Sequence, residues 1–324
     1  MPRFLDLLDF LHSRHFSYYE EKYDHHIQKV IKFSVIVAKL FFCSGMTTVM
    51  SILSAPIITS QDHRTTPLPF PVNLQNRSIF IYLAVYVFQI VALTSAAWTS
   101  IGFDNLSTSM MGLCSAYFAI LRETIEETTK DLLSTKDDGN DLDKYRTLDG
   151  PIHKELSECA EHHLAVIKVT EEIENVFSYV FLSQFLCSAF GICFVGFTFI
   201  NAEPGSVEFI FALSFLGTLM FQITLYCSHG NEVTLQSAMI SDACYMTKWV
   251  YCGPLVRKTL FLIMERSKRP MVLTAGKFVN LSLESLMAVV RHHNLNVVVI
   301  YNVENFDEDE EDKEEEDLTV PTLT

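Results

Sequence analysis

Charged residues are missing from long parts of this 324-residue sequence. Residues 79–103, 176–200 and 209–226 contain none, and residues 33–57 carry only Lys39 near one end. A bilayer core about 30 Å thick needs roughly 20 mostly apolar residues per helical span, because lipid offers backbone groups no hydrogen-bonding partner. Uncharged runs of this length exclude an ordinary soluble domain, since its core would have to be very large to bury them all.

Cysteine frameworks and catalytic motifs are also missing. The eight cysteines fall in the apolar runs, at their edges, or in the loops expected in the cytosol, so we expect no disulfide framework. The pairs His162-His163, near Cys159, and His292-His293 lack a second ligand pair at a spacing that closes a tetrahedral metal site. We therefore expect solvated histidines and no metal site. Residues 275–277 match a phosphate loop only superficially, because Phe278 replaces the required Ser or Thr. We expect no catalytic residue, no cofactor, no enzyme activity and no nucleic-acid partner.

What is present favours an all-α fold, a polytopic transmembrane helical bundle with cytosolic helical extensions. Hydrophobic residues make up 49% of the chain, and the mean hydropathy of +0.22 exceeds that of most soluble domains. The membrane domain is expected over residues 33–303, between an amino-terminal cytosolic segment, 1–32, and a disordered acidic tail, 304–324. The five expected spans lie near residues 33–57, 79–103, 176–200, 207–228 and 271–290 or 271–303. The last contains Lys277 and Glu284, so its hydropathy is the weakest.

The distribution of Lys and Arg predicts the orientation. Five occur in residues 1–32, seven in 104–173 and six in 229–270, against two in 58–78 and two after Val290. The positive-inside rule therefore places the amino terminus and both long loops in the cytosol and the carboxyl terminus outside. The sequon at Asn76 falls in an expected outer loop, so Asn76 is the candidate glycosylation site. We expect no cleavable signal peptide, because Asp6 and Asp9 break the first apolar run.

The expected cytosolic segments carry helical patterns. Apolar residues in 104–127 recur at helical spacing, so we expect the second span to continue beyond the bilayer. Residues 134–150, with an acidic and glycine-containing centre, indicate a mobile linker. Residues 156–176 then predict a helix that continues into the third span. Together these segments predict a cytosolic helical bundle, which is a natural place for subunits to meet.

Four segments resemble insect odorant receptors, and they occur in the family's order. Residues 225–249, LYCSHGNEVTLQSAMISDACYMTKW, resemble the stretch that leaves the sixth helix, and residues 262–286 resemble the arm that enters the seventh. Weaker matches are PLPFP at 67–71 and the segment 159–177 with its EEIE element. The resemblance implies seven spans, whereas this chain shows five and begins just before the family's third.

The carboxyl-terminal part also departs from the family pattern, because Arg291, His292, His293 and Asn294 follow Val290 where the last helix should continue. These departures predict an incomplete or alternatively spliced receptor, or a faulty gene model. Little or no current is expected from this chain alone.

The resemblance implies a function. Insect odorant receptors are ligand-gated cation channels, assembled as tetramers with a shared odorant coreceptor in olfactory signal transduction. Their last helix lines the pore, and the other helices hold a small volatile ligand within the plasma membrane. Alternatives from the residues are a gustatory or other polytopic chemoreceptor, a G-protein-coupled receptor or a small carrier. A G-protein-coupled receptor would place its amino terminus outside, and a carrier should show internal repeats with matching Gly or Pro breaks.

A volatile ligand is small and apolar, so its binding must come from burial against aliphatic and aromatic walls with few polar groups. The candidate odorant-binding residues lie in the outer halves of three expected spans, and the alternative for each is packing or lipid contact. They are Met46, Val49, Met50, Leu53, Tyr82, Val85, Tyr86, Gln89, Phe211 and Phe215. By resemblance, the pore or gate candidates are Val289, Val290, Val297 and Val298. Lys277 and Glu284 are expected in the cytosolic anchor of the pore helix or, alternatively, as a buried ionisable pair.

Overall fold

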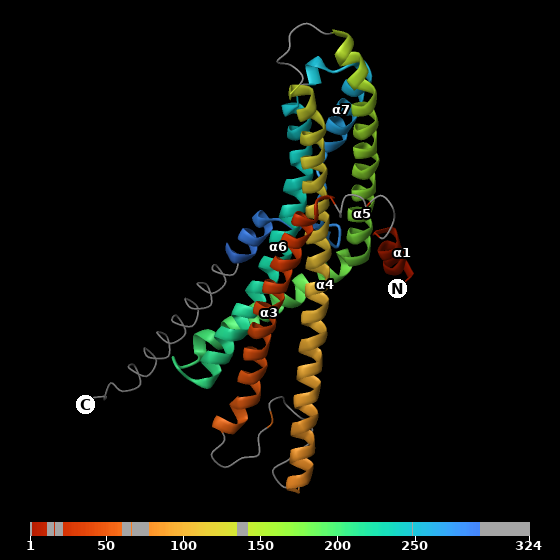
Figure 1. Ribbon diagram of the computed structural model, residues 1–324. Coiled ribbons are helices and arrows are strands. Elements are labelled where there is room, and N and C mark those ends of the chain that lie inside the picture. The colour runs from red at the N-terminus through yellow and green to blue at the C-terminus, as the bar shows by residue number, and fades with distance from the viewer. Residues whose placement is uncertain are drawn as a thin grey trace, which may run out of the picture. The chain divides into compact units, whose positions relative to one another are not determined.

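The structure, a computed structural model, describes residues 2–11, 16, 22–59, 66, 78–134, 142–247 and 249–291. Helices dominate it (Figure 1). They are α1 (Pro2–Leu11), α3 (Asp24–Thr59), α4 (Ile79–Ser134), α5 (Leu142–Asn201), α6 (Val207–Met246), the 3-10 helix η2 (Trp249–Tyr251) and α7 (Pro254–Ser267). A two-stranded antiparallel hairpin follows, with β1 (Thr274–Ala275) paired to β2 (Val279–Asn280), and residues 283–291 are again helical. The expected all-α fold is confirmed.

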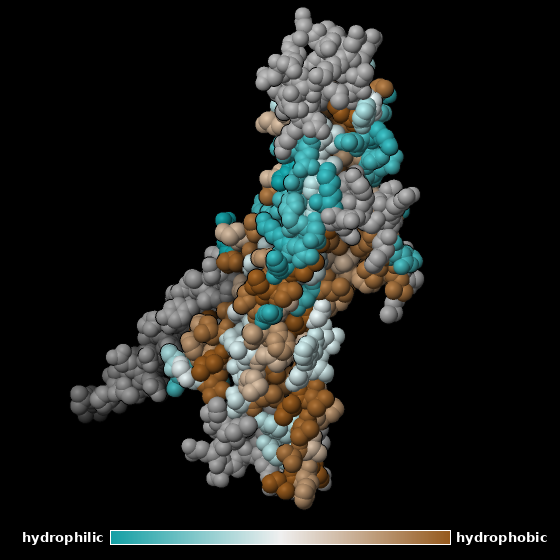
Figure 2. All heavy atoms as spheres, viewed as in Figure 1, coloured by the Kyte–Doolittle hydropathy of each residue, from teal (hydrophilic) through white to brown (hydrophobic). Residues whose placement is uncertain are grey.

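Four helices of the described part, α3 to α6, are long and apolar enough to cross a membrane. Each contains one of the uncharged or nearly uncharged runs of the sequence. Large hydrophobic side chains lie on their outer surfaces, and Phe80, Phe190 and Phe194 are each more than 70% exposed. Figure 2 shows such hydrophobic side chains on the exposed surface of α4, near its beginning. Side chains of this kind are stable at a surface when lipid surrounds it, and the chain is a multi-pass membrane protein.

The second apolar run continues as expected, because α4 is one helix through residues 104–127 and on to Ser134. The linker expected over 134–150 is shorter than predicted. Helix α5 begins at Leu142 and continues through Pro151 into the third apolar run. Leu142, Tyr145 and Leu148 recur at helical spacing, and the acidic residues between them do not interrupt that pattern. Residues 135–141 lie outside the described part.

The fifth expected span differs most from its prediction. Residues 271–282 do not form a helix, because β1 and β2 turn the chain back on itself. Gly276 and Lys277 both have positive φ, 62° and 64°, and the Phe278 amide donates to the Ala275 carbonyl across 3.2 Å. Positive φ at both central residues is the signature of a type I′ hairpin turn, and no α-helix can contain it. Helical structure in this region is described only over 283–291.

The chain divides into two compact units. Unit 1 comprises Met1–Leu40, Gly102–Phe185 and Thr224–Leu283, and unit 2 comprises Phe41–Ile101, Leu186–Ile223 and Glu284–Thr324. Each of the helices α3 to α6 contributes residues to both units. Unit 1 has an apolar core that includes Met111, Phe118 and Phe181, all fully buried. Residues of α1, α7 and the hairpin pack into this core together with residues of the long helices.

The histidine pair at 162–163 is buried in unit 1, so the expectation of solvated histidines is wrong there. His162 is 1% exposed and His163 is 4% exposed. The His162 ring lies 5.3 Å from the Phe16 ring, and the His163 ring lies 6.4 Å from the Phe118 ring, measured between centroids. An imidazole has an apolar body that packs against aromatic rings, which explains why α5 can turn both side chains inward. The second pair, His292-His293, lies outside the described residues.

The hairpin of unit 1 is fixed to α5 at Ser178. The Gly276 amide donates to the Ser178 carbonyl at 2.8 Å, and the Ser178 hydroxyl donates to the Thr274 carbonyl at 2.9 Å. Lys277 forms an ion pair with Glu174, with Nζ and Oε1 3.2 Å apart, rather than with Glu284. The hairpin therefore docks through the backbone atoms of Thr274 and Gly276 and through the Lys277 side chain, and this docking requires its turn to approach α5 closely.

Candidate ligand site

The ten candidate odorant-binding residues all lie in unit 2, on α3, α4 and α6. Val49 and Gln89 are buried, with 8% and 5% of their surface exposed. Met50 is 63% exposed and lies on the outer surface of α3 in this chain. The other seven are half-buried. The candidate set therefore contains a buried part and a part that faces outward.

Helices α3 and α4 meet at Tyr86. Its hydroxyl donates a hydrogen bond to the Leu53 carbonyl at 2.7 Å, and its ring lies 5.9 Å from the Tyr82 ring. Leu53, Tyr82 and Tyr86 were predicted separately from two apolar runs, and the structure brings them together. A phenol oxygen that donates one hydrogen bond can still accept another, so this contact offers a ligand an apolar ring surface and a polar atom.

Helices α3 and α6 meet at a hydroxyl cluster that sequence reasoning missed. The Thr218 Oγ1 lies 2.7 Å from the Ser44 Oγ and 3.1 Å from the Thr48 Oγ1. Thr48 is 5% exposed. In membrane helices, small hydroxyl residues commonly hydrogen-bond across helix interfaces. Ser44 and Thr48 stand four residues apart on α3, and this i, i+4 spacing in an apolar run was the available signal.

The predicted residues of α6 lie one and two turns before this cluster. The rings of Phe211 and Phe215 are stacked, 5.7 Å apart with an interplanar angle of 13°. Phe215 precedes Thr218 by three residues, so the two share one side of α6. The aromatic pair is therefore continuous with the hydroxyl cluster on the helix.

Glycines allow the helices of unit 2 to approach closely. A Cβ built at Gly45 of α3 would lie 2.7 Å from the Ile101 Cδ1, and one at Gly191 of α5 would lie 3.0 Å from the Leu219 Cδ1 of α6. Ser188 stands one turn before Gly191 and therefore shares its side of α5. The Ser188 hydroxyl is buried and has no hydrogen-bond partner within the described part of the chain. Buried hydroxyls normally have a hydrogen-bond partner, so the Ser188 hydroxyl is available to a partner that a bound molecule supplies.

The pore candidates are placed only in part. Val289 and Val290 are half-buried in the helical segment 283–291. Val297 and Val298, the glycosylation candidate Asn76 and the acidic tail lie outside the described residues. The assignment of these four valines to a pore stays a prediction.

Comparison with known proteins places the chain in a family. The family profile of the 7tm odorant receptors matches residues 1–293. The chain is 31% identical over 147 residues to Odorant receptor 94a of Drosophila melanogaster, covering 44% of this chain and 38% of that receptor. It is 25% identical over 261 residues to Odorant receptor 22c of the same species, covering 78% and 63% respectively. The chain thus spans less than two thirds of the length of these relatives.

Solved structures share the fold. The olfactory receptor OR5 from Machilis hrabei, in a structure solved in complex with eugenol, superposes with a TM-score of 0.76 at 16% identity. The superposition covers 93% of this chain and 74% of that receptor. A second structure of OR5 gives a TM-score of 0.69 at 18% identity. Because the family profile covers all of the described residues and the fold agrees with it, this chain belongs to the 7tm odorant receptor family.

Proposed function

We propose that this chain is an odorant receptor subunit that binds small volatile apolar molecules within unit 2. The single observation that carries the proposal is the match of the 7tm odorant receptor family over residues 1–293. The eugenol complex of the Machilis receptor, which has the same fold, supports a small, mostly apolar ligand. We further propose that the subunit works with the shared odorant coreceptor in a tetrameric ligand-gated cation channel.

The chemistry of unit 2 suits such a ligand. A volatile molecule that buries about 250 Å² of apolar surface gains roughly 6 kcal/mol from leaving water. Much of this gain is offset by the lost freedom of the bound molecule, so the net affinity depends on a few polar contacts. The Tyr86 hydroxyl, the cluster around Thr218 and the buried Ser188 hydroxyl provide groups of this kind beside apolar walls.

Filling the buried part of the site should weaken binding. Val49 is 8% exposed on α3, and Val91, on α4 of the same unit, is 61% exposed. In the purified chain in lipid nanodiscs, we expect Val49→Trp to weaken the binding of eugenol or another responsive volatile at least tenfold. The same exchange at Val91 adds the same indole where it meets surrounding lipid, and we expect less than a twofold change. Titration calorimetry measures both.

A second variant, Val49→Ala, keeps the binding proposal testable if the tryptophan variant does not fold. Enlarging the site should shift the preference toward bulkier volatiles while the chain stays folded. Equal effects at Val49 and Val91, or no effect at either, would remove unit 2 as the binding region.

The channel proposal has its own test. A receptor that carries this sequence is expected, with the coreceptor, to give odorant-evoked cation current that persists when G-protein signalling is blocked. Whole-cell recording with and without the coreceptor measures it. A current that disappears on G-protein blockade would contradict the channel mechanism while leaving the binding proposal intact.

The orientation is likewise a proposal. The basic residues of 1–32, 104–173 and 229–270 support a cytosolic amino terminus, with the carboxyl terminus outside the plasma membrane. An epitope at each end, stained in intact and permeabilised cells, measures it. We expect the carboxyl-terminal epitope to stain in intact cells and the amino-terminal one only after permeabilisation, together with an endoglycosidase-sensitive glycan at Asn76. The reverse staining pattern would overturn this topology.

A further inference from the structure

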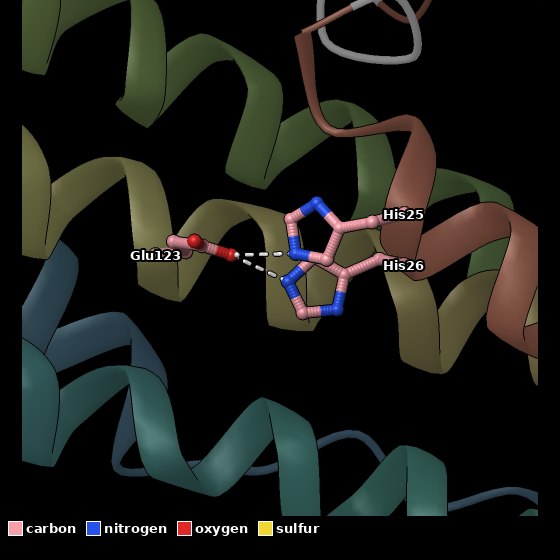
Figure 3. A group of neighbouring side chains, drawn as sticks. All are labelled: His25, His26 and Glu123. Atoms are coloured by element: carbon pink, nitrogen blue, oxygen red, sulfur yellow. Dashed lines mark hydrogen bonds and ion pairs between the residues drawn. The ribbon is translucent and has the colours of Figure 1, made fainter.

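Two adjacent histidines and a distant glutamate converge in unit 1. His25 and His26 lie in the first turn of α3, and Glu123 lies on α4. The Glu123 Oε2 is 2.5 Å from the His26 Nε2 and 3.4 Å from the His25 Nε2. Figure 3 shows both imidazole rings presenting a nitrogen to the same carboxylate oxygen. The rings lie against each other, with centroids 4.2 Å apart. The three side chains thus offer three ligand atoms within 4.8 Å of one another.

These separations are close to those around a transition-metal ion. Two ligand atoms bound to tetrahedral zinc, each about 2.0–2.1 Å from the ion, lie roughly 3.3 Å apart. The distance from His25 to Glu123 already has this value. The distance from His26 to Glu123 is that of a hydrogen bond, and a shift of the carboxylate oxygen by less than about 1 Å would widen it to the separation of two metal ligands. The Glu123 side chain is 34% exposed, so such a shift meets little resistance.

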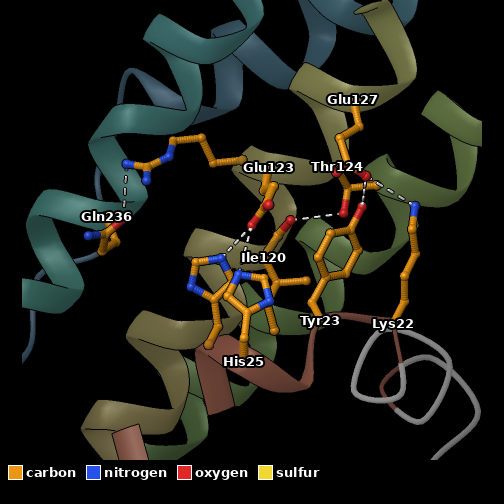
Figure 4. Close-up of polar contacts among 10 residues, drawn as sticks. Lys22, Tyr23, His25, Ile120, Glu123, Thr124, Glu127 and Gln236 are labelled. Carbon is orange, nitrogen blue, oxygen red and sulfur yellow. Dashed lines mark hydrogen bonds and ion pairs between the residues drawn. The ribbon is translucent and has the colours of Figure 1, made fainter. Parts of the chain in front are cut away.

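A second set of contacts, one turn along α4, holds the histidines in place. The Tyr23 hydroxyl donates to the Glu127 Oε2 at 2.7 Å, and the Lys22 Nζ lies 3.3 Å from the same atom (Figure 4). Tyr23 is 2% exposed, so its buried hydroxyl depends on this carboxylate as its partner. Residues 22 and 23 are therefore tied to Glu127, which fixes the backbone immediately before His25. Preorganisation of this kind is what a metal site needs from its supporting residues.

Nearby cations do not neutralise Glu123. Arg122, which directly precedes Glu123 on α4, extends to α6, where it donates to the Gln236 Oε1 at 3.3 Å. Within the described part of the chain, the ion pairs of Glu123 are those with His25 and His26. His26 also borders a cavity of about 450 Å³ lined by Lys29, Arg122 and Glu232 among others. This cavity gives an ion and its water ligands a route to the cluster.

We propose that His25, His26 and Glu123 form a binding site for a divalent transition-metal ion, with Zn²⁺ as the first candidate. Imidazole nitrogens favour zinc and its neighbours over magnesium and calcium, which prefer oxygen ligands. The chain supplies two nitrogens and one oxygen, and water completes the coordination. The ion would join the first turn of α3 to α4 and so clamp the amino-terminal end of the bundle. This proposal departs from the sequence-based expectation of no metal site.

The test uses the whole chain in detergent, without a polyhistidine tag, stripped with a chelator and then loaded with Zn²⁺ or Co²⁺. We expect one bound equivalent by elemental analysis and a visible Co²⁺ absorption band. Glu123→Gln should weaken Zn²⁺ binding at least tenfold and remove the band. The matched control is Glu126→Gln, which removes a half-buried carboxylate of α4 that is neither a proposed ligand nor a support of the site, and we expect it to retain both signals. Mg²⁺ and Ca²⁺ should not compete at equal concentration.

A second variant separates ligation from folding. Glu123→His places an imidazole nitrogen, which reaches about as far as the carboxylate oxygen and is an ordinary zinc ligand, at the same position, and we expect it to restore Zn²⁺ binding that Glu123→Gln loses. A purely structural role for Glu123 predicts no such rescue. Absence of a bound equivalent in the wild-type chain would overturn the proposal. So would equal losses in the Glu123→Gln and Glu126→Gln variants, or binding that survives Glu123→Gln.

Discussion

Replacing Gly276 with alanine is expected to destabilise unit 1 by about 2–5 kcal/mol. The residue has φ +62° at the turn of the hairpin, and an added Cβ would overlap the side chain of Leu182 on α5. A left-handed backbone costs a non-glycine residue roughly 1–2 kcal/mol, and overpacking adds about 1–3 kcal/mol. Moving the turn away from Leu182 lengthens the hydrogen bond from the Gly276 amide to the Ser178 carbonyl. The hairpin that leads to the helix at 283–291 would then lose its attachment.

Thermal unfolding in detergent, followed with a thiol-reactive fluorophore, measures this loss. The chain suits the method because all eight cysteines are free thiols and five of them are buried, Cys114, Cys159, Cys227, Cys244 and Cys252. We expect a clearly lowered midpoint and faster labelling for Gly276→Ala.

Two controls separate the backbone from the steric contribution. Gly205→Ala places alanine at φ +89° with nothing within 4 Å, so it should show the backbone cost alone. Combining Gly276→Ala with Leu182→Ala should recover the steric part, and a double-mutant cycle gives its size. A Gly276→Ala variant as stable as the wild type would show that the hairpin does not dock in this way.

Removal of the Tyr226 hydroxyl is expected to cost unit 1 about 1.5–3 kcal/mol, the range for a hydrogen bond to a charged group. This hydroxyl donates a short hydrogen bond to the Asp104 carboxylate, which joins α6 to α4. Tyr226 is 1% exposed and Asp104 is 3% exposed. A buried carboxylate that loses a donor is poorly compensated, so Tyr226→Phe should lower the unfolding midpoint in the same assay.

The matched control for this prediction is Tyr179→Phe, since Tyr179 is 71% exposed on α5 and its hydroxyl needs no protein partner. We expect that change to cost less than about 0.5 kcal/mol. The double variant Asp104→Leu with Tyr226→Phe removes both partners, and its loss should be smaller than the sum of the two single losses. Strict additivity of the two changes would indicate that the contact contributes nothing to stability.

The local parts of this structure could be predicted from sequence. The uncharged runs and the helical spacing in 104–127 lead directly to α3, α4, α5 and α6, because an α-helix closes its hydrogen bonds four residues apart. The prediction failed at 271–282, whose apolar residues favoured a helix. There Lys277, a non-glycine residue, adopts positive φ, and the chain forms a hairpin. That conformation depends on Ser178 and Glu174, about a hundred residues earlier in the chain.

Side-chain groupings were harder to predict than helices. The ten ligand candidates were chosen from three runs separately, and the contact of Tyr86 with Leu53 emerged only when α3 and α4 were seen together. The hydroxyl cluster was missed because Ser44 and Thr218 are 174 residues apart. The metal-ligand candidates His25 and Glu123 were missed for the same reason, and the pair His162-His163, which attracted attention in sequence, packs inside an aromatic core.

The sequence by itself determined that the chain is helical, that it crosses a membrane several times and that it resembles insect odorant receptors. Those properties follow from composition and from spacings of a few residues, which act within one helix. Only the tertiary structure decided which polar side chains meet, which histidines are buried and where the chain turns before its last described helix. Contacts between helices depend on how residues distant in sequence approach each other, and no local spacing records that approach.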